Sequence, residues 1–408
     1  MRAVRTAVAV GRAQAAGSVR EVLWVTTKLG LTSFGGPIAH LGYFRDEYVR
    51  RRQWLDEGSY ADLVALCQFA PGPTSSKVGF SIGLLRAGYL GGLAAWAGFT
   101  LPSALALLLF AYGAGALSGP IGTGLLHGLK LVAVAIVAQA VWGMAKSLCP
   151  DRERASIAGV AALIVLLSAS RFSQLGSILF GAVAGARLCR EAGVTRAEDA
   201  PIKVSRRVGV AALGAYFALL FGLPLLRAFT DSQAIAMMDA FYRSGALVFG
   251  GGHVVLPLLQ GAVVAPGWVG ADAFLAGYGA AQAVPGPLFT FAAYLGAVMG
   301  PHPNGVTGAA LGLVSIFLPG LLLHLGTLPF WESFRRRAGT QAIMRGINAA
   351  VVGLLGAALY SPIWTSAVQR PQDFAVALVG FILLVGWKAP PVVVVAVSAL
   401  GGVAFSLL

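Results

Sequence analysis

The sequence predicts an all-α polytopic membrane protein, and three observations carry that prediction. Of the 408 residues, 57% are hydrophobic and only 11% are charged, with a mean hydropathy of +0.77. A soluble domain has about 25% charged residues, so this chain has too few to cover the surface of a soluble enzyme. Long apolar runs alternate with short loops rich in Lys and Arg, as in helical membrane proteins. The three cysteines are too few and too scattered for a disulfide framework or a zinc site.

The apolar runs give the order of the expected helices. They cover about 22–44, 59–86, 89–115, 121–146, 155–170, 174–187, 208–228, 239–262, 273–300, 305–325, 343–364, 374–387 and 390–408. A full crossing needs roughly 20 helical residues, and several runs are shorter or interrupted by glycine and proline. Either all thirteen runs cross the bilayer, or nine cross and four (22–44, 59–86, 239–262 and 273–300) are broken or re-entrant.

The basic residues set the expected orientation. The segment 188–207 holds a cluster of Lys and Arg, which the positive-inside rule places in the cytoplasm. The N-terminal segment 1–21 is expected on the same side as a short amphipathic surface segment, since it lacks the compact apolar core of a signal peptide. If 22–44 and 59–86 are re-entrant, the arginines of the loop 45–52 are cytoplasmic too, which favours broken segments.

The chain repeats itself. The first half contains Phe34-Gly35-Gly36-Pro37, then Trp54, then Gln68-Phe-Ala-Pro71-Gly72-Pro73. The second half contains Phe249-Gly250-Gly251-Gly252, then Trp268, then Gln282-Ala-Val-Pro285-Gly286-Pro287, each marker displaced by 214 or 215 residues. Leu101-Pro102 and Leu318-Pro319 add a fourth pair in the same order, so the match indicates an internal duplication.

The second copy is expected to enter the membrane from the opposite side. A single crossing, 208–228, separates the first repeat (22–187) and the basic linker (188–207) from the second repeat (239–408). The loop 45–52 carries four arginines, whereas its counterpart around Trp268 has no Lys or Arg. Opposite charge bias in equivalent loops is typical of inverted repeats, and inverted repeats with broken helices are characteristic of secondary transporters. A channel and a membrane enzyme remain alternatives at this point.

The tripeptide Pro71-Gly72-Pro73 predicts the end of one half-helix and the start of another, because proline lacks the N–H donor and clashes with the preceding turn. A helix start attracts anions, and it is followed here by hydroxyls and a cation, Thr74, Ser75, Ser76 and Lys77. After Pro285-Gly286-Pro287 come only Leu288, Phe289 and Thr290, so the two half-sites are expected to be unequal. The alternative is that these prolines merely kink packed helices.

The glycines Gly35 and Gly36, and Gly250 and Gly251, predict the partner break in each repeat, where the backbone can approach a ligand closely. Simple helix packing by small residues is the alternative. Lys28 and Arg243 precede these breaks at matching positions and suggest an anion path, unless they snorkel to the membrane surface. These observations predict that the residues of the breaks, together with Lys28 and Arg243, bind the substrate. Gln68, Gln282 and His253 belong to the same predicted set.

Other polar residues in the apolar runs favour structural roles. His40 and His253 flank the breaks and are expected to be hydrogen-bonded within the bundle. Asp62 and Asp239 lie near segment ends, which favours a solvated or helix-capping role over a proton relay. Cys67 is expected to be a small packing residue. No Walker loop, metal-ligand cluster or nucleophile elbow is present, so neither an enzyme nor a cofactor is expected.

Taken together, these motifs resemble the chromate ion transporter family in its long, two-domain form, over almost the whole chain. The resemblance implies a multi-pass protein of the bacterial inner membrane that exports chromate, confers resistance and is driven by the membrane potential or proton gradient. It also implies chromate as the ligand and sulfate as a competitor. Nucleic acid is not an expected partner; the lipid bilayer is. The coupling ion and the oligomeric state, including a homodimer, stay open, as do sulfate uptake or exchange and an anion-selective channel.

Overall fold

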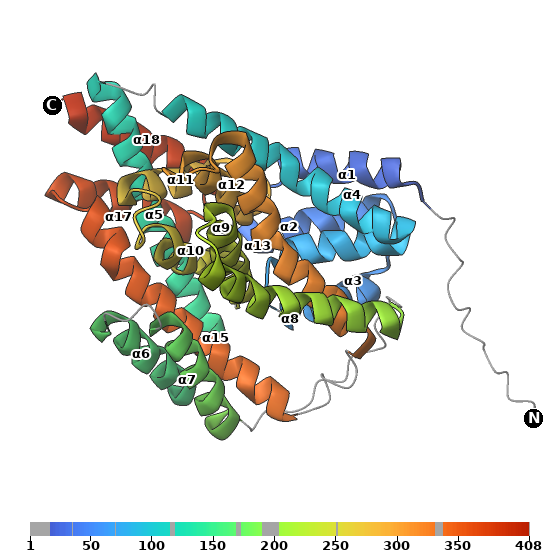
Figure 1. Ribbon diagram of the computed structural model, residues 1–408. Coiled ribbons are helices and arrows are strands. Elements are labelled where there is room, and N and C mark those ends of the chain that lie inside the picture. Colours follow the sequence, from blue (N-terminus) through green and yellow to red (C-terminus); the bar gives the residue numbers. More distant parts are fainter. Residues whose placement is uncertain are drawn as a thin grey trace, which may run out of the picture.

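The computed structural model describes residues 17–34, 36–69, 71–114, 119–168, 173–189, 204–249, 252–330 and 338–407. Within these ranges every regular element is a helix, and five helices are long and apolar enough to cross a membrane. These five cover Thr74–Ala114, Gly119–Leu148, Arg206–Phe229, Gly305–Phe330 and Gly339–Ala367. The prediction of an all-α polytopic membrane protein is confirmed (Figure 1).

The first half of the chain contains two hairpins of short helices followed by longer ones. Its elements are α1 (Val19–Thr32), α2 (Gly36–Phe44), the π-helix η1 (Arg45–Arg51), α3 (Glu57–Phe69), α4 (Thr74–Ala114), α5 (Gly119–Leu148), α6 (Arg152–Leu167) and α7 (Ser173–Leu188). The helix α8 (Arg206–Phe229) then leads to the second half.

The second half has a similar order of elements. They are α9 (Gln233–Ala246), η2 (Gly252–Val254), α10 (Val255–Val263), α11 (Ala271–Ala283), η3 (Leu288–Thr290), α12 (Phe291–Val298), α13 (Gly305–Thr327), η4 (Leu328–Phe330), α15 (Ala338–Ala358), η5 (Leu359–Trp364), α16 (Thr365–Ala367), α17 (Pro371–Val385) and α18 (Pro391–Leu407).

The apolar runs flagged by glycine and proline are broken into shorter helices. The run 22–44 is divided between α1 and α2, and the run 59–86 between α3 and the first part of α4. At 1.5 Å per residue, the 14 residues of α1 reach only about 21 Å, less than the roughly 30 Å of a hydrocarbon core. The long helix α4 also changes direction at Ala87 and Gly88, whose backbone angles are not helical, which separates the runs 59–86 and 89–115.

One long helix of each half, α5 and α15, packs against helices of the other half. In the first half, α5 packs against α17 and α18, where Gly124 and Gly128 lie against Gly402 and Ser398. In the second half, α15 packs against α6 and α7 (Figure 1), and Gly346 lies against the backbone of Gly181 and Gly185. Glycine allows this close approach of helix backbones. Each half therefore completes its packing with helices of the other.

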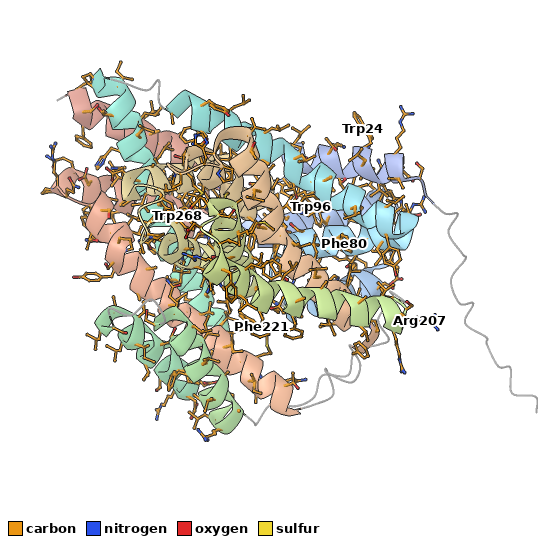
Figure 2. The ribbon with its side chains drawn as sticks, in the orientation of Figure 1. Trp24, Phe80, Trp96, Arg207, Phe221 and Trp268 are labelled. Atoms are coloured by element: carbon orange, nitrogen blue, oxygen red, sulfur yellow. The ribbon has the colours of Figure 1, made fainter. Side chains whose placement is uncertain are left out.

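The single helix α8, predicted over 208–228, connects the two halves and packs on α9 and α13. Its other face carries large exposed apolar side chains, among them Phe221 and Phe229, which suit contact with lipid tails. Figure 2 shows Phe221 on the outer side of α8 and Arg207 at its beginning. Basic residues at the start of a helix, followed by a long apolar stretch, are typical of a helix that begins at a membrane surface.

Candidate functional site

The two Pro-Gly-Pro breaks are each hydrogen-bonded to the glycine-rich break of the other half. The Gly72 N–H donates to the carbonyl of Val248 over 2.8 Å, and the Gly286 N–H donates to the carbonyl of Ser33 over 2.9 Å. The two donors are equivalent positions of the sequence repeat, and so are the two acceptors. All four breaks therefore meet in two matched pairs, far from one another in the sequence.

Both central glycines adopt the same backbone conformation, with φ of +101°, which residues with a side chain rarely adopt. A Cβ on Gly72 would lie 2.9 Å from the Cα of Gly320 in α13. A Cβ on Gly286 would lie 2.8 Å from the Oγ of Ser103 in α4. Gly320 and Ser103 are themselves equivalent residues, each one position after the matched Leu-Pro pair. The breaks thus pack on equivalent helices.

The helix α4 begins at Thr74, directly after the first break, as predicted. The first residues of a helix have backbone N–H groups without partners inside the helix. Two of these residues in α4, Ser75 and Ser76, are buried. The Ser75 hydroxyl lies 3.3 Å from Nδ1 of His40. The Ser76 hydroxyl and Nε2 of His40 are buried and have no hydrogen-bond partner among the described residues. Such unsatisfied groups are rare in native interiors and suggest a ligand or a water.

Lys77 is completely buried, although it sits in the first turn of α4, where the helix dipole disfavours a cation. Its Nζ donates to the carbonyl of Pro71 over 3.1 Å, so the ammonium reaches back across the break. A lysine is almost never fully buried without a charge or dipole to compensate it. The position thus places a cationic side chain within the first turn of α4, at the positive end of the helix dipole.

A histidine that the sequence analysis did not single out joins this region from the second half. His324 on α13 is fully buried, and its Nε2 lies 2.6 Å from the Ser81 hydroxyl on α4. The Cys67 sulfur on α3 lies 3.9 Å from the same nitrogen. The clue available in the sequence is a lone histidine inside an otherwise apolar run. Cys67 is buried as predicted, but in polar surroundings.

The second Pro-Gly-Pro is followed by a less polar helix start. Leu288, Phe289 and Thr290 are all buried, and the Thr290 hydroxyl donates to the carbonyl of Pro287 over 2.8 Å. Nε2 of Gln282 is buried without a partner among the described residues, whereas its counterpart Gln68 is exposed. The two helix starts therefore differ in the polarity of their side chains.

The breaks formed by the glycine clusters are only partly described. Gly36 has φ of +80° and begins α2, while Gly35, Gly250 and Gly251 lie outside the described residues. Nδ1 of His253, just after the second cluster, lies 2.8 Å from the Tyr278 hydroxyl. This contact agrees with a hydrogen-bonded histidine of the bundle.

Lys28 and Arg243 are engaged in ion pairs. Nζ of Lys28 lies 4.0 Å from Glu47, and its side chain is about half exposed. Arg243 pairs with Asp239, which Arg227 of α8 also approaches at 3.4 Å. The expectation of a solvated or capping Asp239 is wrong: its side chain is 1% exposed, because two guanidinium groups compensate its charge inside the bundle. The side chain of Asp62 lies outside the described part.

The arginine-rich loop 45–52 is organised around a carboxylate. Glu47 accepts hydrogen bonds from Arg51 at 3.0 Å and from Arg52 at 2.7 Å. Burial opposes the ionisation of this carboxyl, but the hydrogen bonds from the two arginines hold its pKa below the usual range. The guanidinium groups of Arg52 and Arg86 lie 5.4 and 5.2 Å from the ring centre of Trp54. The guanidinium group of Arg227 lies 5.9 Å from the ring centre of the equivalent Trp268.

Known proteins resemble this chain along most of its length. A probable chromate transport protein of Synechococcus elongatus is 26% identical over 95% of this chain and 96% of its own length. The chromate transport protein of Pseudomonas aeruginosa is 28% identical over 92% and 89%, and that of Cupriavidus metallidurans is 25% identical over 96% and 94%. No solved structure matches the chain.

The sequence profile of one family, described as "Chromate transporter", matches the chain twice, at residues 20–186 and 235–403. The two matches coincide with the halves that carry the paired breaks and together cover most of the chain. The chain therefore belongs to the chromate transporter family, as a multi-pass membrane protein with one family unit in each half.

Proposed function

We propose that this protein is a secondary transporter that exports chromate across the bacterial inner membrane and thereby confers chromate resistance. The observation that carries the proposal is the buried Lys77 ammonium at the start of α4, beside two buried serines. Chromate is a tetrahedral dianion with four acceptor oxygens, and helix starts, hydroxyls and ammonium groups are the donors that suit it. The names of the full-length relatives support chromate as substrate.

The anion site of this proposal is the start of α4, formed by Thr74, Ser75, Ser76 and Lys77 after the Pro-Gly-Pro break. The matching break at Pro285, Gly286 and Pro287, with Gln282 and Thr290, forms the opposite wall. Lys28 and Arg243 lie along the approach, where their ion pairs with Glu47 and Asp239 moderate the charge that the anion meets. His253, Gln68 and the glycine clusters complete the proposed set.

Alternating access supplies the transport cycle in this proposal. The two halves are related as inverted repeats, with the N-terminal segment 1–21 and the linker 188–207 in the cytoplasm. The paired backbone hydrogen bonds, Gly72 to Val248 and Gly286 to Ser33, support equivalent hinges in the two halves. Rocking of one half against the other around a central site is the motion that such repeats perform in other transporters.

The membrane potential is sufficient to drive export. Moving one negative charge out of a cell that is negative inside releases about 2.3 kcal/mol per 100 mV. A dianion releases roughly 4.6 kcal/mol, which sustains a gradient on the order of 2000-fold. Export without a coupled proton is therefore energetically possible.

Uptake of labelled chromate into inverted membrane vesicles tests the proposal. With an imposed potential, we expect saturable accumulation in vesicles that contain the protein and none in vesicles from cells lacking it. Excess sulfate measures how well the site distinguishes the two anions. Active sulfate movement without chromate accumulation would replace the substrate by sulfate, and flux without saturation or exchange would indicate a channel. Either result contradicts the proposal as stated.

A further inference from the structure

The face of α13 that meets α4 carries both a contact with the break and a buried histidine. Gly320 lies against Gly72 and Pro73, and His324 lies about one helical turn further along the same face. On α4, Lys77 and Ser81 are also one turn apart on a common face. The Ser81 hydroxyl is 2.6 Å from Nε2 of His324. The second half thus contributes a polar side chain beside Lys77 of the first.

Nδ1 of His324 is buried and has no hydrogen-bond partner among the described residues. Leaving a buried polar group unpaired costs about 1–3 kcal/mol, so such an atom calls for a partner that binds from outside the chain. The cost is avoidable here, because any apolar side chain of similar size would fill the position. A ligand that comes and goes explains why this nitrogen is left without a partner.

The hydrogen bond on the other ring nitrogen indicates which chemistry Nδ1 offers. When the Ser81 hydroxyl donates to Nε2, the neutral imidazole carries its hydrogen on Nδ1. The Cys67 sulfur lies 3.9 Å from Nε2 and is a second polar neighbour of the same ring nitrogen. In this arrangement Nδ1–H is a donor, and its natural partner is the oxygen of an anion.

The equivalent place in the other half shows that the fold does not require these polar groups. The repeat offsets of 214 and 217 residues match Lys77 with Phe291, Ser81 with Leu295 and His324 with Leu107. All three counterparts are buried, at 0% exposure. The same backbone arrangement is therefore filled by apolar side chains at one place and by polar ones at the other.

We propose that His324 is a ligand of the transported oxyanion, contributed by the second half to the site at the start of α4, and that it donates from Nδ1–H. The inference rests on the proposed function, since it assigns a residue to the same anion site. A tetrahedral oxyanion at this point has Lys77 from α4 and His324 from α13 as donors from opposite halves. Its binding then holds the two halves together at one point of the cycle.

Three substitutions of His324 test this assignment in the full-length protein reconstituted into liposomes, with chromate uptake driven by an imposed potential. His324→Leu removes both nitrogens. His324→Asn keeps an amide near Nδ1, and His324→Gln places its amide nearer to Nε2. We expect His324→Leu and His324→Gln to raise KM about ten- to a hundredfold, the loss of one hydrogen bond to a charged group, with little change in Vmax. His324→Asn should recover most of the affinity.

His127→Gln is the matched control. His127 lies on α5 with its Nε2 2.8 Å from Asp373, and it belongs to neither break. We expect the KM of the His127→Gln variant for chromate to equal that of the wild type. Gel filtration of each variant identifies misfolding, and the Asn and Gln variants, which are of similar polarity, keep the test valid if the Leu variant does not fold.

The outcomes separate this inference from the proposed function. Equal KM values for wild type and His324→Gln, in a wild type that transports chromate, overturn the assignment of His324 alone. Equal impairment of the Asn and Gln variants overturns the assignment to Nδ1. A wild type that transports no chromate overturns the proposed function and this inference together.

Discussion

The two Pro-Gly-Pro breaks share a backbone and differ in their side chains. At both, the central glycine has φ of +101° and donates a hydrogen bond of nearly equal length to the other half. Yet only the first is followed by a buried lysine, with Cys67 and His324 nearby, while the second is followed by Phe291 and Leu295. The matched backbones indicate a shared mechanical element. The unmatched side chains are the reason why the proposed anion site lies at the first break.

The largest expected effect comes from adding a methyl group at the two glycines. Gly72→Ala should lower the free energy of unfolding by about 2–4 kcal/mol, because the strained φ is combined with a clash against the backbone of Gly320. Gly286→Ala should cost less, since its close neighbour is the Ser103 hydroxyl, which can rotate away. Thermal unfolding in detergent measures both. A larger loss of stability for Gly286→Ala than for Gly72→Ala would contradict this difference in packing.

The next effect separates the two helix starts by charge. Lys77→Met keeps the length of the side chain and removes the ammonium, so we expect KM for chromate to rise about a hundredfold. Phe291→Leu, at the equivalent position of the other half, should leave KM unchanged. Uptake into vesicles at a fixed potential gives both values. Similar effects of the two substitutions would mean that binding is shared equally between the breaks.

The arginine-rich loop 45–52 should respond to acid through Glu47, whereas its counterpart around Trp268 has no such carboxylate in its sequence. The pKa of Glu47 is held low in the fold, so its stabilising contribution is present at neutral pH and is lost as the pH falls through that lowered pKa. We therefore expect Glu47→Gln to lower Tm at neutral pH, with the difference from wild type shrinking as the solution is acidified. Melting curves between neutral and acidic pH provide the test. A Tm difference that grows in acid would contradict this assignment.

The smallest effect concerns the approach to the site. Lys28 is about half exposed and lies 4.0 Å from Glu47, so its attraction for an anion acts through solvent. Lys28→Met should reduce the uptake rate at subsaturating chromate about two- to threefold at low salt, and the difference should vanish at high salt through screening. Initial rates at two ionic strengths measure it. An effect that is independent of salt would assign Lys28 a direct contact instead.

Local signals in the sequence were sufficient to predict the helices and their breaks. Pro71 and Pro73 end one helix and start the next wherever they stand, so their effect does not depend on the rest of the fold. The same holds for Lys77, whose place in the first turn follows directly from Pro73. These features are confirmed because their causes lie within a few residues of them.

Contacts between segments that are far apart in the sequence could not be predicted from local sequence signals. His324 has no polar counterpart in the repeat, so a comparison of the two halves gives it no support, and only the packing of α13 on α4 brings it to Ser81. The burial of Asp239 could not be predicted locally, because Arg227, which helps to compensate its charge, belongs to the preceding helix α8. The placement of α5 and α15 against the opposite halves also depends on small residues whose partners lie far away in the sequence.

The packing of α5 and α15 against helices of the opposite halves has a consequence for biosynthesis. Gly181 and Gly185 of α7 pack against α15, which leaves the ribosome much later. At the usual synthesis rate of about 5–20 residues per second, that delay is on the order of ten seconds. During it, the helices already inserted expose close-packing surfaces to lipid or to the insertion machinery. Assembly of the first half is therefore completed only once the second has been made.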